Sequence, residues 1–274
     1  MKIRARTFPS HTAGMLYACK QLLRFGWQQA LSCLFPVVIF AALALTRFVD
    51  LPLLPRYDWL LLICLLMQVL MVWLKLESLD ELKVITLFHV IGLALELFKV
   101  HMGSWSYPGD GYSKLAGVPL YSGFMYASVA SYLCQAWRRL KVELIQWPPT
   151  PIVMILAAAI YLNFFVHHYW IDIRWILSVW VLIVFWKAKV RYSVGKDHYR
   201  MPLVCSFALI GFFIWIAENI ATFFGAWIYP DQREAWSLVH LGKVSSWLLL
   251  VIVSFLIVAS LKRVKGNRNS TCTK

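Results

Sequence analysis

The sequence predicts an all-α, polytopic transmembrane helix bundle with about eight spans, and three observations lead to this prediction. Of the 274 residues, 61% are hydrophobic and 15% are charged, whereas soluble domains carry about 45–50% apolar and about 25% charged residues. Apolar segments recur along the whole chain, and basic residues collect between them. The bilayer is therefore the expected environment, and membrane lipid the expected partner.

The net charge of +14 would suggest nucleic acid as a partner if the chain were soluble. Because the basic residues separate apolar segments, we interpret them as orientation signals and expect no nucleic-acid partner. The six cysteines form no CxxC pair. We therefore expect no metal site, no disulfide framework and no cofactor.

The eight spans follow from length, because a helix needs about 20 residues to cross a hydrocarbon core of about 30 Å. The segments 58–75 and 173–190 are the weakest, being short or flanked by charge. The predicted spans are 29–48, 58–75, 84–100, 119–137, 151–169, 173–190, 202–222 and 237–261.

The distribution of Lys and Arg predicts that both termini are cytoplasmic, since cytoplasmic loops collect basic residues. Seven of the 27 basic residues fall in outside segments, which leaves 20 inside. The expected outside residues are Arg47, Arg56, Lys99, Lys114, Arg174, Arg233 and Lys243.

The same interpretation of the charge distribution divides the chain into two four-helix units with short cytoplasmic segments around them. No cleavage site typical of a signal peptide follows the first apolar stretch. The expected divisions are a cytoplasmic N-terminal segment 1–28, a first repeat 29–137, a cytoplasmic linker 138–150, a second repeat 151–261 and a basic cytoplasmic tail 262–274.

A sequence motif that occurs twice supports the duplication. Both copies read E-x6-G-[SA]-W-x-Y-P, the first from Glu96 to Pro108 and the second from Glu218 to Pro230. Each copy ends an odd-numbered predicted span, the third or the seventh, so both run outward. The sequence therefore predicts a parallel 4+4 repeat, in which a functional site often lies at the interface of the halves.

The two glutamates are the candidate functional groups. Seven residues of helix separate each one from its glycine, or about 10 Å at 1.5 Å per residue, which places Glu96 and Glu218 inside the apolar layer. A carboxylate there costs about 2.5–3.5 kcal/mol and should face protein or water. Either the acids only hold helices together by hydrogen bonds, or they line a cavity where they bind a cation, relay protons or act as acid and base.

The rest of the motif also has two interpretations. Gly103 and Gly225 can end helices, Pro108 and Pro230 prevent their continuation, and the aromatic residues can anchor the interface. Alternatively, the aromatic residues wall the mouth of a ligand pocket. These aromatic residues are Trp105, Tyr107, Trp227 and Tyr229.

Two further polar residues lie close to the glutamates. His89 precedes Glu96 by two helical turns on the same face, so it either shares a polar track with Glu96 or packs against a neighbouring helix. Asn219 follows Glu218 and is a candidate interhelical hydrogen-bond partner.

The run from Phe88 to Pro108, continued by 117–127, resembles the YoaT-like family of bacterial integral membrane proteins, a domain of unknown function. The resemblance covers nearly the whole chain and implies a multi-pass protein of the bacterial cytoplasmic membrane. Glu96 with its glycine and aromatic residues, and Glu218-Asn219 with theirs, are also similar to bacterial carotenoid hydratases. The paired-acid motif typical of the small lycopene cyclases is missing.

Three functions are compatible with these features. The first is binding or transport of a small amphiphile or ion in a cavity between the halves, with Glu96 and Glu218 as exchangeable carboxylates. The second is a membrane enzyme in which one acid protonates an isoprenoid or other lipid and the other stabilises charge. The third is a scaffold in which the polar residues only join helices.

Overall fold

The computed structural model describes the backbone of residues 11–49 and 51–271 and the side chains of 14–49 and 51–259. The basic tail expected at 262–274 and the first ten residues lie outside the described side chains. The described chain is mostly helical. Its α-helices are α1 (His11–Ser32), α2 (Leu34–Phe48), α3 (Arg56–Trp73), α4 (Leu79–His101), α5 (Ser122–Arg139), α6 (Thr150–Val166), α7 (Arg174–Phe185), α8 (Leu203–Phe223) and α9 (Lys243–Thr271), with a 3-10 turn at Pro230–Gln232.

Helices α2 to α9 each overlap one predicted span, but not all are long enough to cross a bilayer alone. Among the described residues α3, α4 and α8 are long and apolar enough, and α1 with α2 makes a fourth if that bent pair is one span. Helices α6 and α7 and the segment Lys243–Ala259 are apolar but shorter. Three to four candidate membrane helices thus agree with a membrane protein.

The bend between α1 and α2 has an identifiable cause. The two helices meet at 67° around Cys33, and Pro36 stands in the first turn of α2. Because proline has no backbone N–H and its ring clashes with the carbonyl four residues earlier, it interrupts a continuous helix at this point. Helix α1 turns aside, and Tyr17 and Gln21 donate hydrogen bonds to Asp197 at the three-stranded sheet.

Short strands correct the all-α prediction. Segments expected to be cytoplasmic loops form an antiparallel sheet in the order β3-β4-β5. The turn between β4 and β5 is at Gly195, with φ +64°. A second hairpin lies between α4 and α5. The strands are β1 (Lys114–Leu115), β2 (Val118–Pro119), β3 (Glu143–Ile145), β4 (Lys189–Val194) and β5 (Asp197–Pro202).

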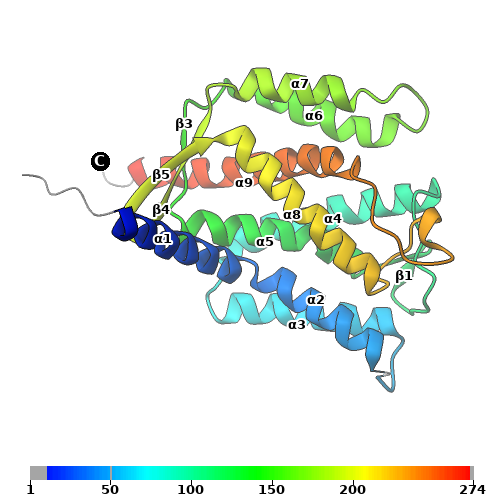
Figure 1. The fold of residues 1–274 in the computed structure, drawn as a ribbon. Helices are drawn as coiled ribbons and strands as arrows, with labels where there is room; N and C mark the ends of the chain where they lie inside the picture. The colour runs from blue at the N-terminus through cyan, green and yellow to red at the C-terminus, as the bar shows by residue number, and fades with distance from the viewer. Residues whose placement is uncertain (1–10, 50, 272–274) are drawn as a thin grey trace, which may run out of the picture.

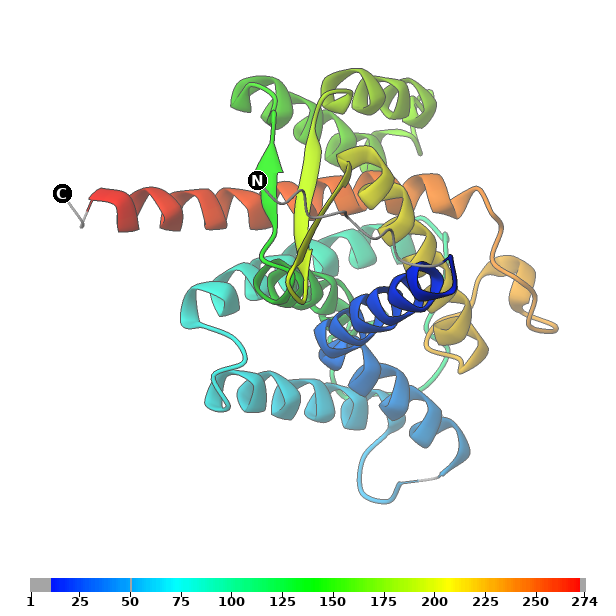
Figure 2. The ribbon, with the colours of Figure 1, turned by 60° about the vertical axis from the view of Figure 1, so that its left-hand side comes forward.

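Most of the helices run roughly alongside one another, and α8 crosses the bundle diagonally (Figure 1). The pairs α2–α3 and α6–α7 flank opposite sides of a central group formed by α4, α5, α8 and α9 (Figures 1 and 2). Within it α4 packs against α5, α8 against α9, and α5 against α9. The sheet β3-β4-β5 lies at one end of the bundle and β1 and β2 at the other, where both motif copies also end (Figure 1).

Both motif helices end in the same way. Gly103 and Gly225 each have φ +68°, and the following amides close the helix in a Schellman arrangement. Ser104 N donates to Lys99 O at 2.9 Å, and Ala226 N donates to Ala221 O at 3.0 Å. The prediction that each glycine ends its helix is therefore confirmed.

Replacing Gly103 by alanine should destabilise the protein by about 1–2 kcal/mol, because a side chain disfavours the left-handed backbone. An added Cβ would meet no atom within 4 Å, so backbone strain is the only expected cost. Thermal unfolding in detergent, followed by tryptophan fluorescence, measures the change.

Gly26→Ala is the matched control. Gly26 lies inside α1 and its Cβ would also have open space, so alanine should be neutral or stabilise by up to about 1 kcal/mol. Equal effects of the two substitutions would contradict the role of the positive φ.

Candidate functional site

Glu96 is buried in α4 and receives hydrogen bonds from three aromatic side chains. Its exposed fraction is 3%. Trp105 Nε1 and Tyr107 Oη donate to Oε2, and Tyr126 Oη donates to Oε1, each at 2.7 Å. The donors come from the loop after α4 and from α5, so one carboxylate joins three parts of the chain.

Two glycines make this arrangement possible. The left-handed turn at Gly103 reverses the chain so that Trp105 and Tyr107 return toward Glu96. Gly92 lets α5 come close, since a Cβ there would lie 2.4 Å from the ring of Tyr126. A side chain at position 92 would therefore push away one of the three donors.

Glu218 is held in a related but not identical way. It is 3% exposed, and its Oε1 accepts from Tyr229, eleven residues later, as Glu96 accepts from Tyr107. Trp247 of α9 donates to Oε2 at 2.6 Å. Trp227 differs from Trp105, because its buried Nε1 makes no hydrogen bond to any residue that the structure describes.

The two motif copies touch at equivalent positions. Ser106 N donates to Ile228 O at 3.0 Å, and Ile228 N donates to Ser106 O at 2.9 Å. Ile228 follows Ser106 by 122 residues (228 − 106), the same separation as between Glu96 and Glu218 (218 − 96). Beside this bridge the rings of Trp105 and Tyr229 meet edge to face at 5.9 Å. The two acid sites thus belong to one continuous cluster.

The tyrosine hydroxyls of the motif act as donors. Burial, together with the nearby carboxylate of Glu96, raises the pKa of Tyr107 well above its usual value, and burial and Glu218 do the same for the pKa of Tyr229. Both phenols therefore keep their protons at any physiological pH. The expectation that these rings anchor the interface is not met by the tyrosines, which are 4% and 7% exposed.

Basic side chains complete the polar cluster. Lys243 Nζ lies 4.5 Å from the ring centroid of Tyr229 and 5.2 Å from that of Trp105, within the range of cation–π attraction. Lys99, 6% exposed, contacts His168 Nε2 at 2.8 Å and His167 Nε2 at 3.3 Å. Burial and the charge of Lys99 lower the pKa of His168 to about 4, so its ring is neutral and can accept.

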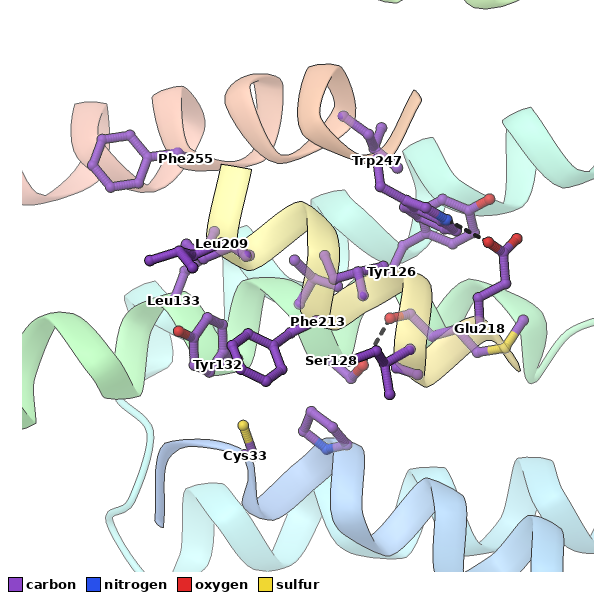
Figure 3. A pocket seen from close by; sticks show the side chains of 18 of the residues that line it. Cys33, Tyr126, Ser128, Tyr132, Leu133, Leu209, Phe213, Glu218, Trp247 and Phe255 are labelled. Atoms are coloured by element: carbon purple, nitrogen blue, oxygen red, sulfur yellow. Dashed lines mark hydrogen bonds between the residues drawn. The ribbon is translucent and has the colours of Figure 1, made fainter. Parts of the chain in front are cut away.

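A cavity of about 950 Å³ connects this cluster to an apolar interior. Figure 3 shows Tyr126, Glu218 and Trp247 toward one end, and Tyr132 and Phe213 farther along. The size and the mostly apolar lining with a few polar groups are typical of small-molecule sites. The cavity passes between α5, α8 and α9 and reaches α1 and α2.

The structure brings together most, but not all, of the residues selected from sequence. The residues of that set that line the cavity are Glu96, Trp105, Glu218, Trp227 and Tyr229.

The other three lie behind the cavity or beside it. Tyr107 does not line the cavity, but it donates a hydrogen bond to Glu96, which does. Asn219 joins α8 to the following loop, as it donates to Trp215 O and accepts from Val239 N at 2.9 Å. His89 packs against Phe124 and Gly123 of α5, in agreement with a packing role.

Sequence reasoning missed several cavity residues. Lys99 and Lys243 were assigned to outside segments because of their charge. Each lies at the end of an apolar stretch, and because a buried cation is costly there, this position was the signal that could have identified them. Tyr126 and Trp247 carry no pattern that separates them from ordinary interfacial aromatic residues. The cavity residues outside the predicted set include Lys99, Tyr126, Arg174, Lys243, Ser246 and Trp247.

Comparison with known proteins identifies the family. Residues 21–255 match the family model described as "Protein of unknown function (DUF817)". The chain belongs to this family. A relative from Bacillus subtilis (strain 168), described as "Uncharacterized protein YoaT", is 76% identical over 248 residues, which are 90% of this chain and 94% of the relative. The resemblance to the YoaT-like family is therefore confirmed.

One solved structure is partly similar. The crystal structure of a cross-linked MvINS trimer has 12% sequence identity and a TM-score of 0.49, covering 68% of this chain and 95% of its own. We draw no functional conclusion from so distant a likeness.

Tyr107→Phe should lower the free energy of unfolding by about 1–3 kcal/mol, because it removes a donor from a buried carboxylate. Tyr112→Phe provides the control, since Tyr112 is 83% exposed and its change should stay within about 0.5 kcal/mol. Chemical unfolding in detergent measures both. A Tyr107 effect no larger than that of Tyr112 would show that the bond to Glu96 does not hold the site together.

Proposed function

We propose that the protein is a multi-pass membrane protein built from two four-helix units, α2 to α5 and α6 to α9, which run in the same direction across the bacterial cytoplasmic membrane. The paired bridge at Ser106 and Ile228 supports this arrangement. In a two-fold arrangement a residue on the axis meets its own equivalent, as these two positions do.

Helix packing supports the same symmetry. Helix α2 contacts α8 of the other unit, and its equivalent α6 contacts α4. Likewise α2 packs against α5 of its own unit, and α6 packs against α9. Helices α3 and α7 also both begin at an arginine, Arg56 and Arg174.

The ends of the bundle support an orientation with both termini cytoplasmic. The strands β4 and β5 and the end of α5 carry a dense set of basic residues at one end of the molecule (Figure 1), as cytoplasmic loops do. The opposite end holds the motif loops. These basic residues are Arg138, Arg139, Lys141, Lys189, Arg191, Lys196 and Arg200.

Single cysteine tags introduced at positions 110 and 232 should both face the outside, and one at 196 should face the cytoplasm. Labelling of these cysteines in intact cells with a membrane-impermeant thiol reagent measures this. Tags at 110 and 232 on opposite sides would exclude the parallel arrangement.

We further propose that the cavity binds a small amphiphile taken from the bilayer. The observation that carries this proposal is that a single cavity has both buried carboxylates at one end and an apolar lining along its remaining length. An amphiphile has the matching distribution of polar and apolar groups. Isoprenoid and acyl chains both fit the apolar part.

The apolar lining includes exposed side chains of α1, α2 and α8. These residues are Leu22, Val37, Leu209, Phe213 and Ile220. In a membrane these side chains contact acyl chains, and a tail entering between them never meets water. A lateral entrance suits a ligand that partitions into the bilayer.

A purely structural role is the second candidate. All four oxygens of Glu96 and Glu218 accept hydrogen bonds from the chain itself. A scaffold would need the same bonds. The two functions differ in whether anything occupies the cavity.

Ala217→Phe separates them. Ala217 lines the cavity on α8, and a phenyl ring there should displace a bound tail. Lipids that co-purify with the protein, quantified by mass spectrometry after gentle detergent extraction, should fall at least about tenfold, equivalent to about 1.4 kcal/mol of binding free energy.

Val69→Phe serves as the control, because Val69 is 67% exposed on α3 and lies outside the cavity. It should leave the co-purifying lipids unchanged. The same lipid content in both variants and the parent protein, with unchanged unfolding temperatures, would support the scaffold instead.

A further inference from the structure

The polar end of the cavity carries more than the two glutamates. Three cationic side chains line it: Lys99, Arg174 and Lys243. They come from α4, α7 and α9, so the tertiary fold assembles them around one place.

The two acids that line the cavity, and Asp172 beside Arg174, already have partners. The carboxylate oxygens of Glu96 and Glu218 accept from tryptophan and tyrosine donors of the chain. Asp172 accepts from Arg174 Nε at 2.5 Å. A ligand would therefore find few free acceptors among these three acids.

The cations, in contrast, keep donors available. An ammonium group carries three N–H donors, yet Lys243 Nζ makes no hydrogen bond to any described residue and rests on two aromatic rings. Among the described residues, the polar contacts of Lys99 Nζ are with the two histidine nitrogens. Arg174 donates to Asp172 and to Ser246 at 3.3 Å, which leaves other guanidinium donors.

The aromatic faces also argue against a cationic ligand. The rings of Trp105 and Tyr229 are the surfaces on which a quaternary ammonium group would sit, but Lys243 already occupies that position. A ligand cation would have to displace a lysine of the chain. An anion would instead add the missing acceptors.

Lys243 is also the first residue of α9. The N-terminus of a helix carries partial positive charge, which favours anions. The amides of Lys243 and Val244 already donate to His240 O and Leu241 O, so the helix end contributes through this charge. Ser246, one turn later, lines the cavity as well. The start of α9 thus attracts an anion, as the lysines do.

We propose that the amphiphile bound in the cavity has an anionic headgroup, a phosphate or a carboxylate, held by Lys99, Arg174 and Lys243. This inference rests on the proposed amphiphile-binding function and names the ligand class of the same site. The tail lies along the apolar part toward Tyr132 and Phe213.

Matched probes with a common twelve-carbon tail test the proposal. Dodecyl phosphate and dodecanoate supply the two anionic headgroups, 1-dodecanol a neutral one and dodecyltrimethylammonium a cationic one. The intact protein in phosphatidylcholine nanodiscs is titrated with each, and the dissociation constant is taken from the concentration dependence of the unfolding temperature.

At least one anionic probe should bind about tenfold more tightly than 1-dodecanol and dodecyltrimethylammonium, a difference of about 1.4 kcal/mol. The anionic probe with the lower dissociation constant shows whether the site prefers a phosphate or a carboxylate headgroup. Inorganic phosphate without a tail should not compete at matched concentration.

Lys243→Gln should weaken the anionic probe by at least about tenfold and leave 1-dodecanol unchanged, whereas Lys243→Arg should keep the affinity within about threefold. Lys99→Gln, measured in parallel, tests the second lysine. It also replaces Lys243→Gln as the test if that variant does not fold. Lys83→Gln is the control, since its side chain is 80% exposed on α4.

Equal affinity for all four probes, with no effect of Lys99→Gln and Lys243→Gln, would overturn the anionic headgroup and leave amphiphile binding intact. Absence of saturable binding by every probe, or binding that Ala217→Phe does not weaken, would overturn the proposed function itself.

Discussion

The burial of two carboxylates among aromatic donors is the constraint on which the rest of the structure depends. An acidic side chain inside an apolar layer is costly unless its oxygens are bonded. Here Glu96 draws the loop after α4 and the helix α5 toward itself, and Glu218 does the same with the loop after α8 and with α9. Each acid therefore fixes where a neighbouring helix and a loop must lie, and Gly92, Gly103 and Gly225 supply the close approach and the turns that this requires.

The direct pairing of the two motif loops turns two local sites into one. Because Ser106 and Ile228 exchange backbone hydrogen bonds, the buried acids stand on either side of a shared aromatic cluster, and Lys243 lies over rings from both copies. A cavity lies beside this junction, lined by residues of α5, α8 and α9. The polar end of the cavity thus lies at the cluster where the two motif copies are hydrogen-bonded to each other.

The opposite end of the molecule is organised differently. The segments after α5 and after α7 pair as strands, with Glu143 beside Arg191 at 3.0 Å, so their basic residues are presented on a sheet. Helix α1 lies against this sheet and turns away from α2 at Pro36, and so the cavity wall there is formed by α1 and α2 together. The cavity thus has an apolar wall at this end and a hydrogen-bonded polar cluster at the other.

Apolar length and the spacing of Glu, Gly and aromatic residues are local properties, so the sequence could predict the helical segments that became α2 to α9 and reveal the doubled motif. It did not predict helix α1, which occupies most of the expected N-terminal segment 1–28. Residues 96 and 218, with Trp105, Trp227 and Tyr229, do meet at one cavity. Sequence reasoning could not find the strands at 143–145 and 189–202, since their pairing is nonlocal and their residues are no more apolar than a loop. Packing between distant helices sets which side of each helix faces the cavity, and no local pattern reveals this. It is this packing that brings Tyr126, Trp247 and the lysines at 99 and 243 to the acids, and that leaves His89 and Asn219 outside the cavity.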